Sequence, residues 1–230
     1  MTSAAADPTN RKNRLPLWLK LAFTGYVAIV VAVYWRHYGP TNFLYFCDVA
    51  LLMTAAALWL ENSLLASAAL IGIFLPQMVW VVDFLGMVVG LPVNGMTAYM
   101  FKPPRFLRAL SFFHFWLPFF LLGLTWRLGY DRRAFVLWAV LAWVLLGICY
   151  VFMPGPSPSA ADSDLPVNIN YVYGFSETEP QQWIDDPDVY FALVMLALPL
   201  GILLPSHLVF MWLLPRADRD RPVKEPGPGG

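Results

Sequence analysis

The stretch 134-AFVLWAVLAWVLLGICYVF-152 contains neither a charged residue nor a proline. Its 19 residues would form an α-helix about 28 Å long, which is close to the thickness of the hydrocarbon core of a bilayer. A charge-free segment of this length predicts a helix that crosses a membrane.

Comparable apolar blocks occur along the rest of the chain. The composition also indicates a membrane protein, since 59% of the residues are hydrophobic and 13% are charged. This charged fraction is about half that of a soluble domain. Prolines within three of the blocks do not exclude helices, because neighbouring segments in a membrane bundle satisfy the freed carbonyls. The sequence predicts an all-α polytopic membrane protein, a six-transmembrane-helix bundle whose other spans lie near residues 17–35, 42–60, 64–85, 107–126 and 189–214.

The chain is expected to form one domain flanked by two tails. The first apolar block is longer than the core of a signal peptide and ends in the interfacial segment 34-YWRHYGP-40, so it predicts a retained helix. We expect a membrane domain over residues 15–215, with its largest outer loop at 153–188. Residues 1–14 and 216–230 are polar and predicted to be disordered cytoplasmic tails.

The distribution of charge predicts the orientation in the membrane. With the N-terminus inside, eleven Lys and Arg residues fall on inner segments and four on outer ones. This asymmetry favours cytoplasmic positions for both termini. The 153–188 loop has seven acidic residues and no basic one, which also places it outside. We expect a bacterial inner membrane, with membrane lipids and no nucleic acid as partners.

Rare ionisable residues gather near the outer ends of the predicted spans. Asp48 lies in 43-FLYFCDVALL-52, and a carboxylate in hydrocarbon usually has a partner and a function. Helical rise places Asp48 about 10 Å and His114 about 9 Å below the outer surface. We expect His114, Arg36 or Arg105 as the partner of Asp48. The same layer contains Cys47, Asp83, His37 and the loop segment 168-NINYVYG-174.

Three interpretations of this layer stay open. In the first, Cys47 is the nucleophile for acyl transfer or ester hydrolysis on a lipid, His114 is the general base and Asp48 supports them. In the second, His37, Asp48, Asp83 and His114 bind zinc, although no HxxxH or HExxH spacing supports this. In the third, the polar residues only hold together a lipid-binding or membrane-assembly protein. The absence of a repeat and of a continuous polar stripe argues against a transporter.

Three motifs carry a resemblance to a known family. In order, they are 42-NFLYFCDVALL-52, 111-SFFHFWLPFFLL-122 and 170-NYVYG-174. The chain resembles the YwaF-like integral membrane proteins, whose animal relative, transmembrane protein 164, is a phospholipid acyltransferase. More distantly it is similar to the androgen-induced-gene fatty-ester hydrolases, and along its length it also resembles uncharacterised bacterial membrane-associated proteins.

The resemblance implies roles for particular residues. Cys47 matches the acyl-carrying cysteine and His114 the histidine of the fourth helix, with no cofactor required. Asn170, Tyr171 and Tyr173 match the loop motif and are expected, with Arg36 and Asp83 of the same layer, to bind the substrate. Where the family has His and Asn around the cysteine, this chain has Tyr45 and Asp48. A disulfide between Cys47 and Cys149 is conceivable, although lone buried cysteines are more often apolar filler.

Overall fold

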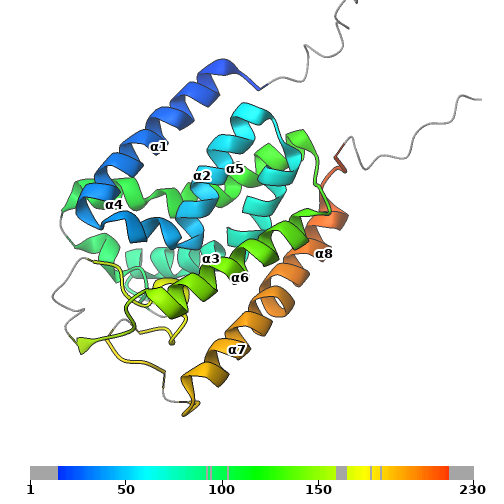
Figure 1. The fold of residues 1–230 in the computed structure, drawn as a ribbon. Coiled ribbons are helices and arrows are strands. Elements are labelled where there is room, and N and C mark those ends of the chain that lie inside the picture. The colour runs from blue at the N-terminus through cyan, green and yellow to red at the C-terminus, as the bar shows by residue number, and fades with distance from the viewer. Residues whose placement is uncertain are drawn as a thin grey trace, which may run out of the picture.

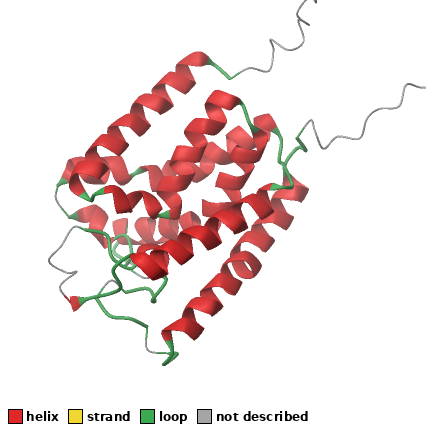
Figure 2. Cartoon of the chain, in the orientation of Figure 1, coloured by secondary structure: helices red, strands yellow, loops and turns green. Residues whose placement is uncertain are grey.

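The computed structural model describes residues 15–91, 93, 95–102, 104–158, 165–176, 178–181 and 183–217. This part of the chain is all-α and has no β-strand (Figures 1 and 2). The all-α class is therefore confirmed. The helices are α1 (Leu17–His37), α2 (Phe46–Leu60), α3 (Ser63–Val88), α4 (Arg105–Ser111), α5 (Phe113–Leu128), α6 (Ala134–Phe152), α7 (Pro187–Ala197) and α8 (Leu204–Leu213). Shorter helical segments are η2 (Pro40–Leu44), η3 (Ala98–Phe101), η5 (Ile169–Tyr171) and η6 (Leu198–Leu203).

Five helical segments of the described chain are long and apolar enough to cross a membrane. They are α1, α3, α6, the pair α4–α5 and the segment formed by α7, η6 and α8. The remaining expected span, predicted at residues 42–60, is shorter than predicted, since α2 has 15 residues and begins at Phe46. The preceding residues Pro40–Leu44 form the tight turn η2 instead, with Pro40 at its first position. The structure thus supports a membrane protein, with α2 about 22 Å long.

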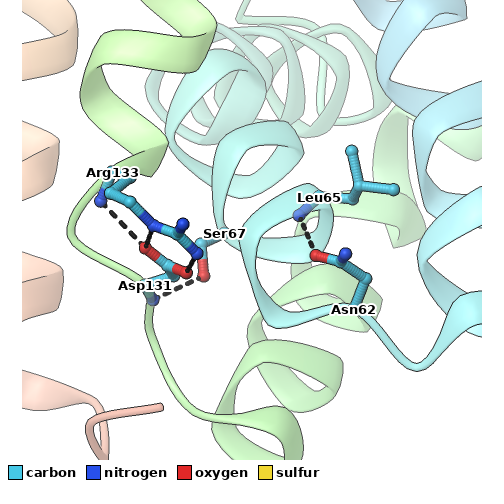
Figure 3. A network of polar contacts seen from close by, with 5 residues as sticks. All are labelled: Asn62, Leu65, Ser67, Asp131 and Arg133. Carbon is cyan, nitrogen blue, oxygen red and sulfur yellow. Dashed lines mark hydrogen bonds and ion pairs between the residues drawn. The ribbon is translucent and has the colours of Figure 1, made fainter. Parts of the chain in front are cut away.

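A tight turn makes α2 and α3 antiparallel neighbours, as their short connection predicted. Glu61 ends α2 in the left-handed conformation, with a φ of 48°. Asn62 then begins α3, its side chain accepting a 3.1 Å hydrogen bond from the Leu65 amide (Figure 3). From this turn α3 runs through the centre of the bundle and packs against α2, α5 and α6.

Small residues let other helices approach α3 closely. Ala66, Ala68 and Ala69 are completely buried. At Gly72 the Trp138 ring of α6 lies so close that a Cβ atom would be 1.9 Å from its Cε2. The core of the bundle therefore lies around the first half of α3.

Two of the predicted helices are interrupted. The fourth apolar block is divided at Phe112, between α4 and α5. Pro118 lies inside α5, and the interruption comes before His114, not at the carbonyl that Pro118 releases. The sixth block continues through the π-helical segment η6, which contains Pro199, a common way for a helix to absorb a local irregularity.

Both ends of the described chain lie at the same end of the bundle, which we call the terminal end (Figure 1). Here Lys20 forms a 2.6 Å ion pair with Glu61. The Tyr130 amide donates to the Pro215 carbonyl at 2.6 Å, and the Ala217 amide donates to the Tyr130 carbonyl at 3.1 Å. Residues 216 and 217 thus belong to the folded body, although they were predicted as tail. The predicted tails 1–14 and 218–230 lie outside the described residues.

Figure 3 shows a second polar network at the terminal end, which sequence reasoning missed. The buried carboxylate of Asp131 accepts from the Arg133 guanidinium at 3.0 and 2.6 Å. The Asp131 amide donates to the Ser67 hydroxyl at 3.0 Å. This network fastens the α5–α6 connection to α3.

Candidate functional site at the start of α2

Asp48, in the first turn of α2, is 3% exposed. Its Oδ2 accepts a 3.1 Å hydrogen bond from the Asn42 side chain. Its Oδ1 has no hydrogen-bond partner within the described chain. The expected partners His114, Arg36 and Arg105 form neither an ion pair nor a hydrogen bond with it there. The structure therefore replaces the predicted charged partner by a neutral amide and leaves one buried oxygen unsatisfied.

Cys47 lies beside this carboxylate and is partly accessible. Its Sγ is 3.9 Å from Asp48 Oδ2, a long contact even for a thiol donor. Cys47 and Cys149 are both free thiols. Cys149 is buried and accepts a 3.6 Å contact from the Asn170 side chain, so it is not in a disulfide with Cys47.

The ring of His114, near the start of α5, is held in one orientation. Its Nδ1 lies 2.7 Å from the Ser111 carbonyl, which can only accept a hydrogen bond. Nδ1 therefore carries the hydrogen, and Nε2 keeps its lone pair. The ring also stacks on Trp80, with centroids 5.4 Å apart. Within the residues described, Nε2 has no hydrogen-bond partner.

Hydroxyl-bearing side chains surround these groups. Tyr34 of α1 shares a 2.7 Å hydrogen bond with the Ser111 hydroxyl, and Trp80 donates to the Tyr99 hydroxyl at 3.2 Å. Asp48 lies within electrostatic range of the Tyr34 hydroxyl, and Cys47 within that of Tyr99. Burial is the largest cause of the raised pKa of the Tyr99 phenol, which stays protonated at neutral pH. We call Tyr34, Cys47, Asp48, Trp80, Tyr99, Ser111 and His114 the polar cluster.

Asp83, near the end of α3, was expected in the same layer but serves the following loop. Its Oδ1 accepts from the amides of Val93 and Gly95 at 3.0 and 2.9 Å. Its Oδ2 accepts from the amide and hydroxyl of Thr97 at 2.9 and 2.7 Å. A fully buried carboxylate that receives four hydrogen bonds has its charge compensated by the loop. Its contacts are those of a structural anchor.

Asn170 connects the 165–176 loop to the beginning of α2. Its Oδ1 accepts from the Phe46 amide at 3.0 Å, and its Nδ2 donates to the Leu44 carbonyl at 2.9 Å. These backbone groups flank Tyr45, two residues before Cys47, and would otherwise need partners at the start of a helix. The structure therefore uses the predicted substrate-binding amide to position α2.

The two tyrosines of the loop motif have different environments. Tyr173 donates from its hydroxyl to the Tyr150 carbonyl at 2.8 Å, and the two rings stack 5.0 Å apart. Burial, followed by the negative charge of Asp188, raises the pKa of the Tyr173 phenol. Tyr171 is 37% exposed and lies near Phe175, with ring centroids 5.9 Å apart. Only Tyr171 presents a large part of its ring at the surface.

The remaining predicted residues, Arg36 and His37, are exposed at the end of α1. The His37 ring contacts Tyr38, with centroids 4.7 Å apart. Among the described residues, which include His37, Asp48, Asp83 and His114, no three His, Cys, Asp or Glu side chains are grouped so that they could bind a metal ion. The zinc interpretation therefore lacks the ligand set that it requires.

Sequence reasoning missed the amides that organise this end of the bundle. Asn42 supplies the hydrogen bond to Asp48. Asn168 is 1% exposed and folds the 165–176 loop by donating to the carbonyls of Gly174 and Ser176 at 2.7 and 2.8 Å. Gln77 is also buried, and neither atom of its amide has a partner in the described chain. A glutamine directly after Pro76 is expected to bind the carbonyl that the proline releases, but in the structure the Gln77 amide does not do so.

Comparisons of the chain with protein-family models, curated proteins and solved structures find no match.

Proposed function

We propose that this protein catalyses acyl transfer from, or hydrolysis of, an ester of a membrane lipid, with Cys47 as the nucleophile.

In this proposal the chain crosses a bacterial inner membrane six times, with α2 as the shortest span. The occurrence of both described ends at the terminal end of the bundle supports a position for them on one side of the membrane, which in this proposal is the cytoplasm (Figure 1). Membrane-impermeant maleimide should then label cysteines introduced into the 153–188 loop of intact cells, and should not label cysteines in the tails.

The contrast between Asp48 and Asp83 carries the functional proposal. Both side chains are almost fully buried, but Asp83 receives four hydrogen bonds and Asp48 receives one from an amide. An unsatisfied buried polar atom costs about 1–3 kcal/mol. A carboxylate retained at such a cost beside a cysteine side chain is typical of a reactive site.

The chemistry assigns a role to each group. His114 accepts the thiol proton at Nε2, because Nδ1 is committed to the Ser111 carbonyl. The resulting thiolate attacks the carbonyl carbon of the ester and forms a carbon–sulfur bond. Collapse of the tetrahedral intermediate breaks the bond to the alcohol, which leaves with the proton from His114. Water or a second alcohol then cleaves the thioester. Asp48, whose Oδ2 lies 3.9 Å from Cys47 Sγ, provides polar support beside the nucleophile.

Acylation of purified protein in detergent micelles tests this proposal. An alkyne-tagged 4-nitrophenyl ester of a fatty acid should acylate Cys47, located by mass spectrometry of the peptides. His114→Ala should slow acylation by about 10²–10⁴-fold. Cys149→Ser is the matched control and should retain wild-type labelling, since this thiol is buried. Labelling that persists in Cys47→Ser, or is unaffected by His114→Ala, contradicts the mechanism.

A non-catalytic membrane-assembly role is the second candidate. It is favoured by Asp83 and Asn170, whose polar atoms bind backbone groups of the chain itself. If the wild-type thiol is no more reactive toward the ester than an unfolded cysteine, this second function replaces the first.

A further inference from the structure

Gln77 is a buried polar residue to which neither the fold nor the proposed mechanism gives a function. It lies in α3 directly after Pro76 and is 3% exposed. Neither Nε2 nor Oε1 has a hydrogen-bond partner in the described part of the chain. Pro76 disrupts the helical ladder, but the Gln77 amide does not bond to the carbonyl that Pro76 releases. An amide buried in an apolar span with both polar atoms free indicates a ligand.

The α2–α3 hairpin places Gln77 at the level of Asp48. Asp48 lies 12 residues before Leu60 at the end of α2, and Gln77 lies 14 residues after Ser63 at the start of α3. The helical rise puts them about 18 and about 21 Å from the turn. Asp48 in α2 and Gln77 in α3 therefore lie at a similar level of two adjacent helices, and each has a buried polar atom without a partner in the described chain.

The helical phase directs Gln77 toward the polar cluster. Trp80 follows Gln77 by almost one turn, so the two side chains lie on the same side of α3. Trp80 stacks on His114 of α5, and α3 packs against both α2 and α5. Gln77 thus lies on the α3 face that carries the contact with His114, at the level of Cys47 and Asp48.

We infer that Gln77 binds the carbonyl oxygen of the lipid ester through its Nε2 hydrogens and stabilises the oxyanion that forms during acylation. This inference rests on the proposed function, because it concerns the ester that Cys47 attacks. As the carbon–sulfur bond forms, the π electrons of the carbonyl move to its oxygen. The Gln77 amide donates to that oxygen until the electrons return and expel the alcohol. A buried donor with no competing partner suits this role.

Two reagents separate oxyanion stabilisation from simple access to the thiol. The 4-nitrophenyl ester passes through an oxyanion, whereas an alkyl methanethiosulfonate of the same chain length is attacked at sulfur and has no carbonyl. We expect Gln77→Leu to slow acylation of Cys47 by about 10²–10³-fold. Reaction with the methanethiosulfonate should keep the wild-type rate.

Thr125→Val is the matched control. Thr125 also has a buried hydroxyl without a partner in the described chain, but it lies close to the end of α5, near the terminal end. It should keep both rates. Equal slowing of both reactions by Gln77→Leu in a protein that still elutes as a single species, or wild-type acylation by this variant, overturns the role of Gln77. If the 4-nitrophenyl ester does not acylate the wild-type protein at all, the proposed function itself is refuted.

Discussion

Phe46 donates from its amide to Asn170 Oδ1 at 3.0 Å, which joins residues 124 positions apart in the sequence. The contact lies where α2 begins, next to Cys47. α2 is apolar and, with 15 residues, shorter than the five segments that are long enough to cross a membrane. Backbone groups at the start of a helix need partners, which are scarce among apolar side chains. Asn170 provides them from the loop before α7.

Replacing Asn170 by Ala should destabilise the protein by about 2–4 kcal/mol, because the Phe46 amide and the Leu44 carbonyl both lose their partner. Thermal unfolding in detergent, followed by tryptophan fluorescence, measures the loss. Asn170→Asp keeps the acceptor for Phe46 but places a carboxylate oxygen against the Leu44 carbonyl, so it should not restore the wild-type melting temperature. An Ala variant that melts at the wild-type temperature would show that water replaces Asn170 and that the loop does not hold α2.

The two buried aspartates should lose different amounts of stability on the same substitution. Asp83→Asn places an NH₂ group against the amides of the 93–97 loop and should cost about 2–4 kcal/mol of stability. Asp48→Asn keeps an acceptor for Asn42 and should cost less than about 1 kcal/mol while slowing the acylation of Cys47. Hydrogen exchange at residues 93–97 and acylation rates provide the two measurements. If both variants lose the same amount of stability, Asp83 is not a structural anchor in a sense that Asp48 is not, and the contrast between the two carboxylates is lost.

The fold class followed from the sequence because the length of an apolar block is a local property. Each predicted block contains helix in the structure. Boundaries were less predictable where a turn competes with the helix, as in Pro40–Leu44, which delays α2 to Phe46. Similarly, no proline or glycine in the sequence marks the interruption at Phe112, between α4 and α5.

The candidate site was only partly predictable. Depth along a helix places Cys47, Asp48 and His114 in one layer, but it does not reveal which polar atoms find partners. The partner of each polar atom depends on loops that return to the bundle. For example, the amides of Val93, Gly95 and Thr97 donate hydrogen bonds to the Asp83 carboxylate.

At the terminal end, Arg133→Met should destabilise the protein by about 1–3 kcal/mol. The Asp131 carboxylate has a side-chain exposure of 1% and would lose its bidentate charged partner. Arg132→Met is the matched control, because the neighbouring Arg132 is exposed; its effect should stay within about 0.5 kcal/mol. Thermal unfolding of both variants checks the difference. If the two variants lose equal stability, the ion pair in Figure 3 does not hold the α5–α6 connection.

Close packing of α3 against α6 leads to the last prediction. A methyl group at Gly72 would overlap the Trp138 ring, so Gly72→Ala should cost about 1–3 kcal/mol despite the higher helix propensity of alanine. Trp138→Phe supplies space and loses no hydrogen bond, because Trp138 Nε1 has no partner in the described chain. The double variant should therefore be more stable than the sum of the two single losses implies. Gly147→Ala in α6, where nothing lies within 4 Å of an added Cβ, should be neutral or stabilising. Additive losses at Gly72 and Trp138 in thermal unfolding would mean that α6 moves away to accept the methyl group, and that the contact does not fix the distance between the two helices.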